Sequence, residues 1–184
     1  SLSIAAAGLA APATISSSDG APRKLSALLA ELAPHFEQRG IVYAVADDPE
    51  AHLAYALKGV EVAPRNGGLR LNTGAARYRL GDLDGAETDF RAALAAVPGH
   101  PDATGGLAAG LELRGRDAEA LALLGPVVAS GSAPPAILTA WARLQVGRPN
   151  AGRAEERLRA LLEQPLAAIE RSHALFALAD LLDA

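Results

Sequence analysis

The side chains of this chain that are best suited to chemistry are an asparagine and an arginine, Asn72 and Arg79, in the segment LNTGAARYR. Both carry N–H donors, and a guanidinium together with a carboxamide suits the oxygens of a carboxylate. Ala75 and Tyr78 lie between them. These residue types allow recognition of a carboxylate, with a general groove contact or ordinary surface packing as the alternatives, and no catalytic dyad can be assembled locally.

Patterns for catalysis and metal binding are missing from the sequence. The chain has no cysteine, which excludes disulfides, thiolate zinc sites and cysteine nucleophiles. Gly105-Gly106 precedes no Lys-Ser/Thr pair and follows no predicted strand, so it is not a phosphate loop. The histidines are never three or four residues apart, and we interpret them as surface or cap residues. They are His35, His52, His100 and His173. We therefore predict no catalytic residue, no metal and no cofactor.

Composition favours packed helices. Half of the 184 residues are apolar but only 4% are aromatic, so the core must consist largely of alanine and leucine. The formal net charge of -4 argues against a nucleic-acid partner. No run reaches the roughly 18 apolar residues that a membrane span needs, so we predict no membrane insertion.

The candidate residues depend on a helix pair for their position. The segment Gly67–His100 predicts two short helices joined by a Gly-Asp turn and closed by Pro98. Gly81 ends the first helix, where a left-handed backbone carries no penalty for glycine. Asp82 or Asp84 can then cap the second helix by accepting from its free amides.

Small residues are predicted to set how these two helices pack. Gly74 and Ala86 face each other where the helices cross, because only small side chains allow that approach. Phe90 and Leu94 share one stripe of the second helix, and Ala93 keeps the seam to the next unit tight. A two-helix unit cannot bury its own apolar face, so it must stack against further units.

With these residues at these spacings, the segment closely resembles a tetratricopeptide repeat. Arg70 and Arg77 depart from the pattern, which prefers bulky apolar or aromatic residues there. The resemblance implies an all-α fold, a right-handed α-solenoid of antiparallel helix pairs. It extends more loosely along the chain through small residues spaced 34, 32 and 39 apart. These residues are Gly74, Ala108, Ala140 and Ala179.

We divide the chain into an N-terminal arm or linker, residues 1–22, and a repeat domain, residues 23–184. The arm is interpreted as a flexible linker, with the remnant of a secretory signal as the alternative. The approximate units are 23–66, 67–100, 101–132, 133–171 and a half unit, 172–184.

Several local features are predicted outside the clear repeat. An amphipathic helix begins at Arg23 and is kinked or shortened by Pro34, and another begins with Asp48 as its cap. Pro126 should truncate the second helix of its unit, and the turn GRPNAGR should be about two residues longer than its counterpart. The final segment HALFALADLLDA presents many apolar residues, so we interpret it as a cut end or as a surface that a domain or partner covers.

The resemblance places four candidate residues on the inner face of the superhelix, which is lined mostly by first helices. Asn72 and Arg79 resemble part of the clamp with which some members of the family hold the terminal carboxylate of a peptide. Gly106 and Ala109 stand at the corresponding places in the next unit, so a full clamp is absent. The four candidates are Asn72, Ala75, Tyr78 and Arg79.

Trp141 and Gln145 are candidates of a second kind. Trp141 is the single tryptophan, and in a groove it would anchor a peptide. The alternative is that it is buried at the seam between two repeats.

The leading functional interpretation is a non-catalytic module that binds a peptide or helix of a partner protein in the groove. Two alternatives remain open: the N-terminal repeat region of a larger bacterial enzyme, of sulfotransferase or aspartyl/asparaginyl hydroxylase type, and a periplasmic assembly scaffold. We expect a cytoplasmic protein, or a periplasmic one if residues 1–17 derive from a signal. Self-association through the arm is a further expectation.

Overall fold

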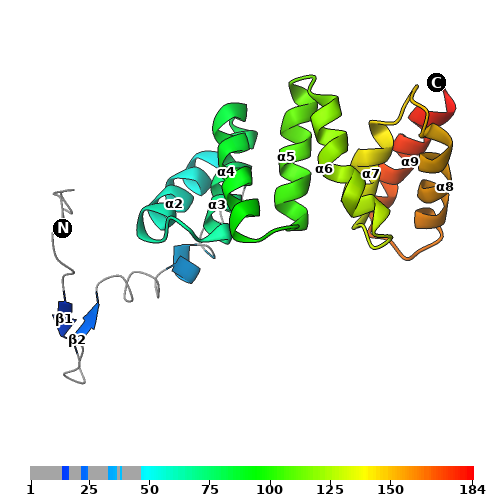
Figure 1. Ribbon diagram of the computed structural model, residues 1–184. Coiled ribbons are helices and arrows are strands. Elements are labelled where there is room, and N and C mark those ends of the chain that lie inside the picture. The colour runs from blue at the N-terminus through cyan, green and yellow to red at the C-terminus, as the bar shows by residue number, and fades with distance from the viewer. Residues whose placement is uncertain (1–13, 17–21, 25–32, 37, 39–46) are drawn as a thin grey trace.

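The computed structural model describes residues 14–16, 22–24, 33–36, 38 and 47–184, and most of these lie in a row of helices (Figure 1). Residues 33–36 and 38 are helical. Two short strands, β1 (Thr14–Ser16) and β2 (Pro22–Lys24), pair antiparallel. The helices that follow are α2 Pro49–Val62, α3 Gly67–Arg79, α4 Leu83–Ala96, α5 Pro101–Leu113, α6 Asp117–Ala129, α7 Pro135–Arg143, α8 Ala151–Leu162 and α9 Ala168–Leu182.

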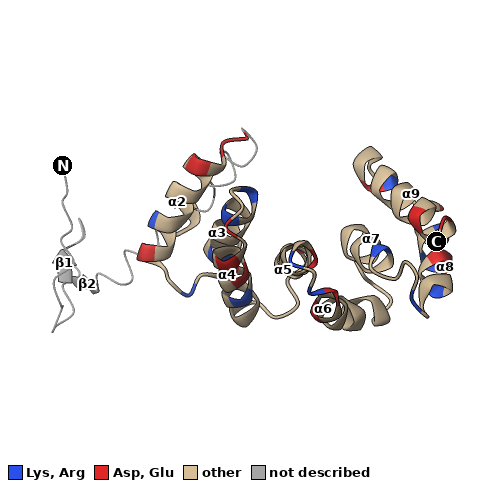
Figure 2. Cartoon of the chain, turned by 90° about the horizontal axis from the view of Figure 1, so that it is seen from above, with Lys and Arg blue, Asp and Glu red and all other residues tan. Residues whose placement is uncertain are grey.

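The helices stack as a solenoid. From α2 to α9 each helix packs against the next one along the chain. The first helices of the pairs also contact one another, α3 with α5, α5 with α7 and α7 with α9. Figure 2 shows the row as a bow, with these first helices on its inside. The predicted solenoid of helix pairs is confirmed, and its inner layer consists of α3, α5, α7 and α9.

Alanine and leucine fill the seams between these helices, as the composition predicts. Ala86 is 1% exposed, and the side chains of Leu124 and Leu158 are fully buried. One continuous cluster of buried apolar residues extends from α4 to α9. Because each seam is shared by neighbouring pairs, the stability of one pair depends on the next.

The predicted turn between α3 and α4 is confirmed. Gly81 has a φ of 81°, a backbone conformation that a side chain would strain. Asp82 caps α4, because its Oδ1 accepts from the backbone N–H of Gly85 at 2.9 Å. Asp84, the other candidate cap, pairs with Arg114. The start of α2 is also as predicted, since Oδ1 of Asp48 accepts from Ala51 at 2.9 Å.

The crossing of α3 and α4 is filled differently from the prediction. The atoms nearest to a Cβ placed on Gly74 would be those of the Phe90 ring, at 2.8 Å from Cδ1, rather than those of Ala86. Glycine at this position therefore makes room for an aromatic ring.

Three local predictions are corrected. Pro126 does not truncate α6, which continues to Ala129; the backbone N–H of Ser130 still donates to the Pro126 carbonyl at 3.1 Å. The connection of α7 to α8 covers residues 144–150, longer than predicted, because α7 ends early at Arg143. Arg23 lies in β2 rather than at a helix start.

The last helix also begins earlier than the predicted half unit, residues 172–184. α9 starts at Ala168, before residue 172. Of its apolar side chains, Leu175 and Phe176 are exposed, as predicted for this segment, whereas Leu178 is buried. Most of the helix predicted to begin at Arg23 lies outside the described residues.

Candidate functional site

Four of the six candidate residues meet at one hollow on the inner face. The hollow, of about 410 Å³, lies between α2, α3 and α5, over the Phe90 ring of α4. Its described lining comes from residues far apart in the sequence. This lining is His52, Leu71, Asn72, Ala75, Tyr78, Arg79, Phe90, Asp102 and Gly106.

The floor of the hollow is apolar, and two glycines permit it. A Cβ on Gly106 would lie 2.5 Å from Cζ of Phe90, just as one on Gly74 would lie 2.8 Å from Cδ1 of the same ring. The ring therefore fits between α3 and α5, where it is 3% exposed and joins both helices. Leu71 and Ala75 continue the apolar floor along α3.

The rim of the hollow carries charge. Arg79, at the end of α3, forms an ion pair with Asp47, which precedes α2. The Asp47 side chain is 86% exposed and that of Arg79 is 33% exposed, so the pair is well solvated. An exposed pair of this kind contributes about 0–1 kcal/mol, and a ligand can exchange with it at little cost. Asp102, in the first turn of α5, also lines the hollow.

His52 differs from the other polar residues of the lining. It is 2% exposed, and neither ring nitrogen has a hydrogen-bond partner among the residues that the structure describes. Burial lowers the pKa of His52, so its imidazole is neutral near pH 7. Interpreting this histidine as a surface or cap residue was wrong. No spacing pattern could have found it, because the burial of a side chain depends on tertiary packing around its helix rather than on its neighbours in sequence.

The two arginines that depart from the repeat pattern have a shared partner. Asp89 of α4 is 1% exposed, and Nη1 of Arg70 lies 2.9 Å from one of its oxygens while Nη1 of Arg77 lies 2.7 Å from the other. The carboxylate thus ties two turns of α3 to α4. The role of Asp89 was not predicted from the sequence, although two arginines at apolar positions were a signal that a buried acid must lie opposite them.

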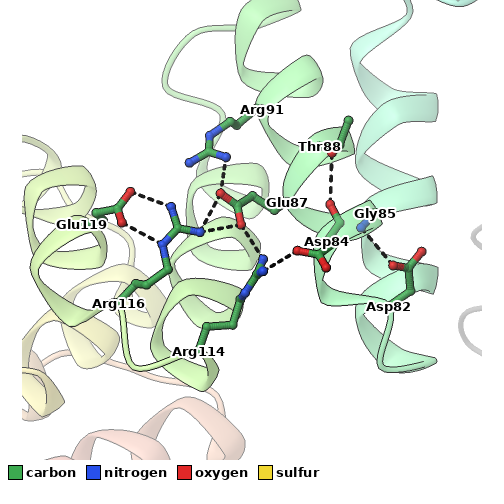
Figure 3. A network of polar contacts seen from close by, with 9 residues as sticks. All are labelled: Asp82, Asp84, Gly85, Glu87, Thr88, Arg91, Arg114, Arg116 and Glu119. Atoms are coloured by element: carbon green, nitrogen blue, oxygen red, sulfur yellow. Dashed lines mark hydrogen bonds and ion pairs between the residues drawn. The ribbon is translucent and has the colours of Figure 1, made fainter.

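A second ionic cluster joins α4 to α5 and α6 (Figure 3). Glu87 is at its centre, with Arg114 and Arg116 each 2.7 Å away and Arg91 beside it on α4. Burial raises the pKa of Glu87, but hydrogen bonds from Arg116 and Arg91 lower it by more, so the pKa lies below its usual value. Arg116 also binds Glu119, whose pKa is lowered by that hydrogen bond. The cluster positions the helices that carry the hollow.

The remaining two candidates lie apart from the hollow. Trp141 is 5% exposed in the apolar core and Gln145 is 4% exposed. Trp141 is therefore a buried core residue, as in the alternative interpretation, rather than an anchor in the groove. A separate hollow of about 400 Å³ lies between α7 and α9, where Arg143, His173 and Phe176 are among its lining residues.

Metal-binding clusters and membrane-spanning helices are both missing from the described part of the chain. It contains no group of three or more His, Cys, Asp or Glu residues that could hold a metal ion. None of the helices found there has the length and apolar character needed to cross a membrane.

Comparison by sequence finds no matching family model and no matching curated protein. Comparison of structures finds tetratricopeptide-repeat folds. A structure of MamA from Desulfovibrio magneticus has a TM-score of 0.60 and 20% identity over 84% of this chain and 94% of that one. YrrB, described as a TPR protein with an unusual peptide-binding site, has a TM-score of 0.61 and 16% identity over 86% and 91%. PilF of Pseudomonas aeruginosa has a TM-score of 0.65 and 17% identity over 84% and 75%. The chain therefore has the fold of the tetratricopeptide-repeat proteins.

Proposed function

We propose that this chain, which has the tetratricopeptide-repeat fold, binds a peptide segment of a partner protein at the hollow between α2, α3 and α5. The observation that carries the proposal is the convergence of Asn72, Tyr78 and Arg79 on one apolar hollow of the inner face. An apolar floor with a few polar groups at its edge is the usual composition of a ligand site. The role is non-catalytic binding.

The chemistry of the rim indicates which part of a peptide it holds. The Arg79 guanidinium can bind a carboxylate of the peptide in place of Asp47, because the existing ion pair is exposed and contributes little energy. The Asn72 carboxamide lies on the same helix and bears donors and an acceptor for the peptide backbone. The floor formed by Leu71, Ala75 and Phe90 takes an apolar side chain. The ligand is therefore a short peptide with a carboxylate next to an apolar residue.

The peptide-binding site named for YrrB supports the choice of ligand class, since YrrB shares this fold. The support concerns the fold, because the two chains are 16% identical. The residues of the present hollow carry the rest of the argument.

Selection of peptides tests the proposal. A random peptide library is displayed and selected on the purified chain, and the affinity of each selected sequence is measured by calorimetry. Substituting Arg79→Ala should weaken binding about tenfold or more, the scale of a hydrogen bond between charged groups.

Arg153→Ala is the matched control, because Arg153 is an exposed arginine of α8, remote in sequence from the hollow. This control should bind every selected peptide as the wild type does. Selection that yields no binding sequence, or binding that Arg79→Ala and Arg153→Ala affect equally, would refute the proposed site.

A further inference from the structure

His52 is the buried polar side chain of the hollow that the proposed binding mode does not yet use. It lines the hollow from α2, together with the polar residues of α3. Both of its ring nitrogens are buried, and no described residue pairs with either of them. Buried polar groups in proteins nearly always have a hydrogen-bond partner, so two orphaned nitrogens on one ring require a reason.

The protonation state of this ring limits what it can bind. Desolvation keeps the imidazole neutral near pH 7, so one nitrogen donates and the other accepts. A cationic ligand group gains no charge partner from it. A carboxylate binds more favourably at Arg79 on the rim, where a guanidinium and solvent both stabilise it. With cationic groups and carboxylates excluded, the ligand group that suits His52 is an uncharged polar one.

We infer that His52 determines the specificity of the hollow by hydrogen-bonding an uncharged polar side chain of the bound peptide, a hydroxyl or a carboxamide. This inference rests on the proposed function, because it names one residue of the same ligand. Because both ring nitrogens are buried, the imidazole must rotate toward the hollow for this bond to form. It then gains the partner that the described residues do not provide, beside Leu71 and Phe90, which line the same hollow. A polar site rejects an apolar analogue because the analogue leaves the buried nitrogens unpaired.

The experiment repeats the peptide selection on the wild type, on His52→Leu and on His52→Gln. Peptides from the wild type should share Ser, Thr, Asn or Gln at one fixed position. Replacing that residue by Ala should weaken binding to the wild type about tenfold, the scale of one buried hydrogen bond left unmade. The same replacement should leave the affinity of His52→Leu unchanged. His52→Gln, which keeps a donor and an acceptor, should retain the preference.

Outcomes of this selection separate the inference from the proposed function. If peptides bind through Arg79 but His52→Leu selects the same residue at that position, the inference is overturned and the proposed function stands. If no peptide binds the wild type, both are overturned.

A second measurement covers the case in which His52→Leu fails to fold. The ring ¹⁵N resonances of His52 are recorded in the wild type with saturating peptide. They should shift with the selected peptide and shift less with its Ala-substituted form. Identical shifts with the two peptides would overturn the inference.

Discussion

The two halves of the solenoid use the same helix pair but are stabilised by different interactions. Between α3 and α6, the buried Asp89 pairs with two arginines and the nearly buried Glu87 with three, so the helices are held by charge as well as by apolar contact. Between α7 and α9, buried leucines dominate, and Ile169 and Phe176 remain 67% and 71% exposed. The fold therefore requires only small and apolar residues at the seams, and the polar contacts are additional.

This difference is connected to the proposed site. The hollow lies in the half with ionic clusters, where Arg70 and Arg77 fix α3 against α4 and so fix the helix that carries Asn72 and Arg79. A binding site needs side chains held by a rigid support, and the paired carboxylates provide it. The half made of leucine seams supplies length to the solenoid and an apolar surface on α9.

The largest effect is expected from Leu158→Ala in α8. Leu158 is fully buried, so its truncation should destabilise the protein by about 2–5 kcal/mol, through lost burial and the cavity left behind. Urea denaturation measures the loss. Amide hydrogen exchange should show faster opening in α7–α9 than in α3 and α4, because each seam supports mainly its neighbours.

The matched control is Leu113→Ala, whose side chain is 65% exposed and should change stability by no more than about 0.5 kcal/mol. Equal acceleration of exchange in both halves would contradict the distinction between them.

Asp89→Asn, which lies in the half between α3 and α6, should have the next largest effect on stability. The substitution keeps the shape but removes the charge that faces Arg70 and Arg77, and it turns an amide group toward a guanidinium. We expect a loss of about 1–3 kcal/mol, below the value for a fully buried pair because both arginines are 27% exposed. Thermal and urea denaturation measure it.

Asp180→Asn on α9, an exposed aspartate, is the control and should be close to neutral. If Asp89→Asn were equally neutral, the buried carboxylate would not be a support for α3.

Glu87→Gln should have the smallest effect on stability and the clearest dependence on pH. Since the pKa of folded Glu87 is lowered, its contribution is present above the unfolded pKa, about 4.3, and is lost as pH falls through the folded value. The wild type should therefore be more stable than Glu87→Gln at pH 7, and the difference should disappear in acid.

Salt provides an independent check on Glu87. The difference at pH 7 should shrink when ionic strength is raised from 0.1 M to about 1 M, because the cluster is partly solvated and the Debye length falls to about 3 Å. A difference that is constant with both pH and salt would mean that Glu87 acts through packing rather than charge.

Local signals predicted the segment from Gly67 to His100 well, because its turn and its helix end each depend on one residue. Gly81 was recognisable from its position after a helix, and the cap was narrowed to Asp82 or Asp84 from their position before one, of which the structure shows Asp82. The continuation of α6 through Pro126 was not recognisable from the sequence. The burial of Leu124 and Val128 on the same helix can outweigh the penalty of a proline. The environments of His52 and Asp89 depend on other helices, so spacing alone could not show them.

The sequence by itself determined that the chain forms helix pairs and that these pairs stack, because glycine, proline, caps and small residues act within one or two turns of the chain. It also placed Asn72, Ala75, Tyr78 and Arg79 on one face. Only the tertiary structure decided that Phe90 lies between two glycines from different helices, that Asp89 holds two arginines, and that His52 borders the hollow with its nitrogens buried. These features arise from contacts between separate helices, and burial and desolvation are set by the packed assembly rather than by neighbours in sequence.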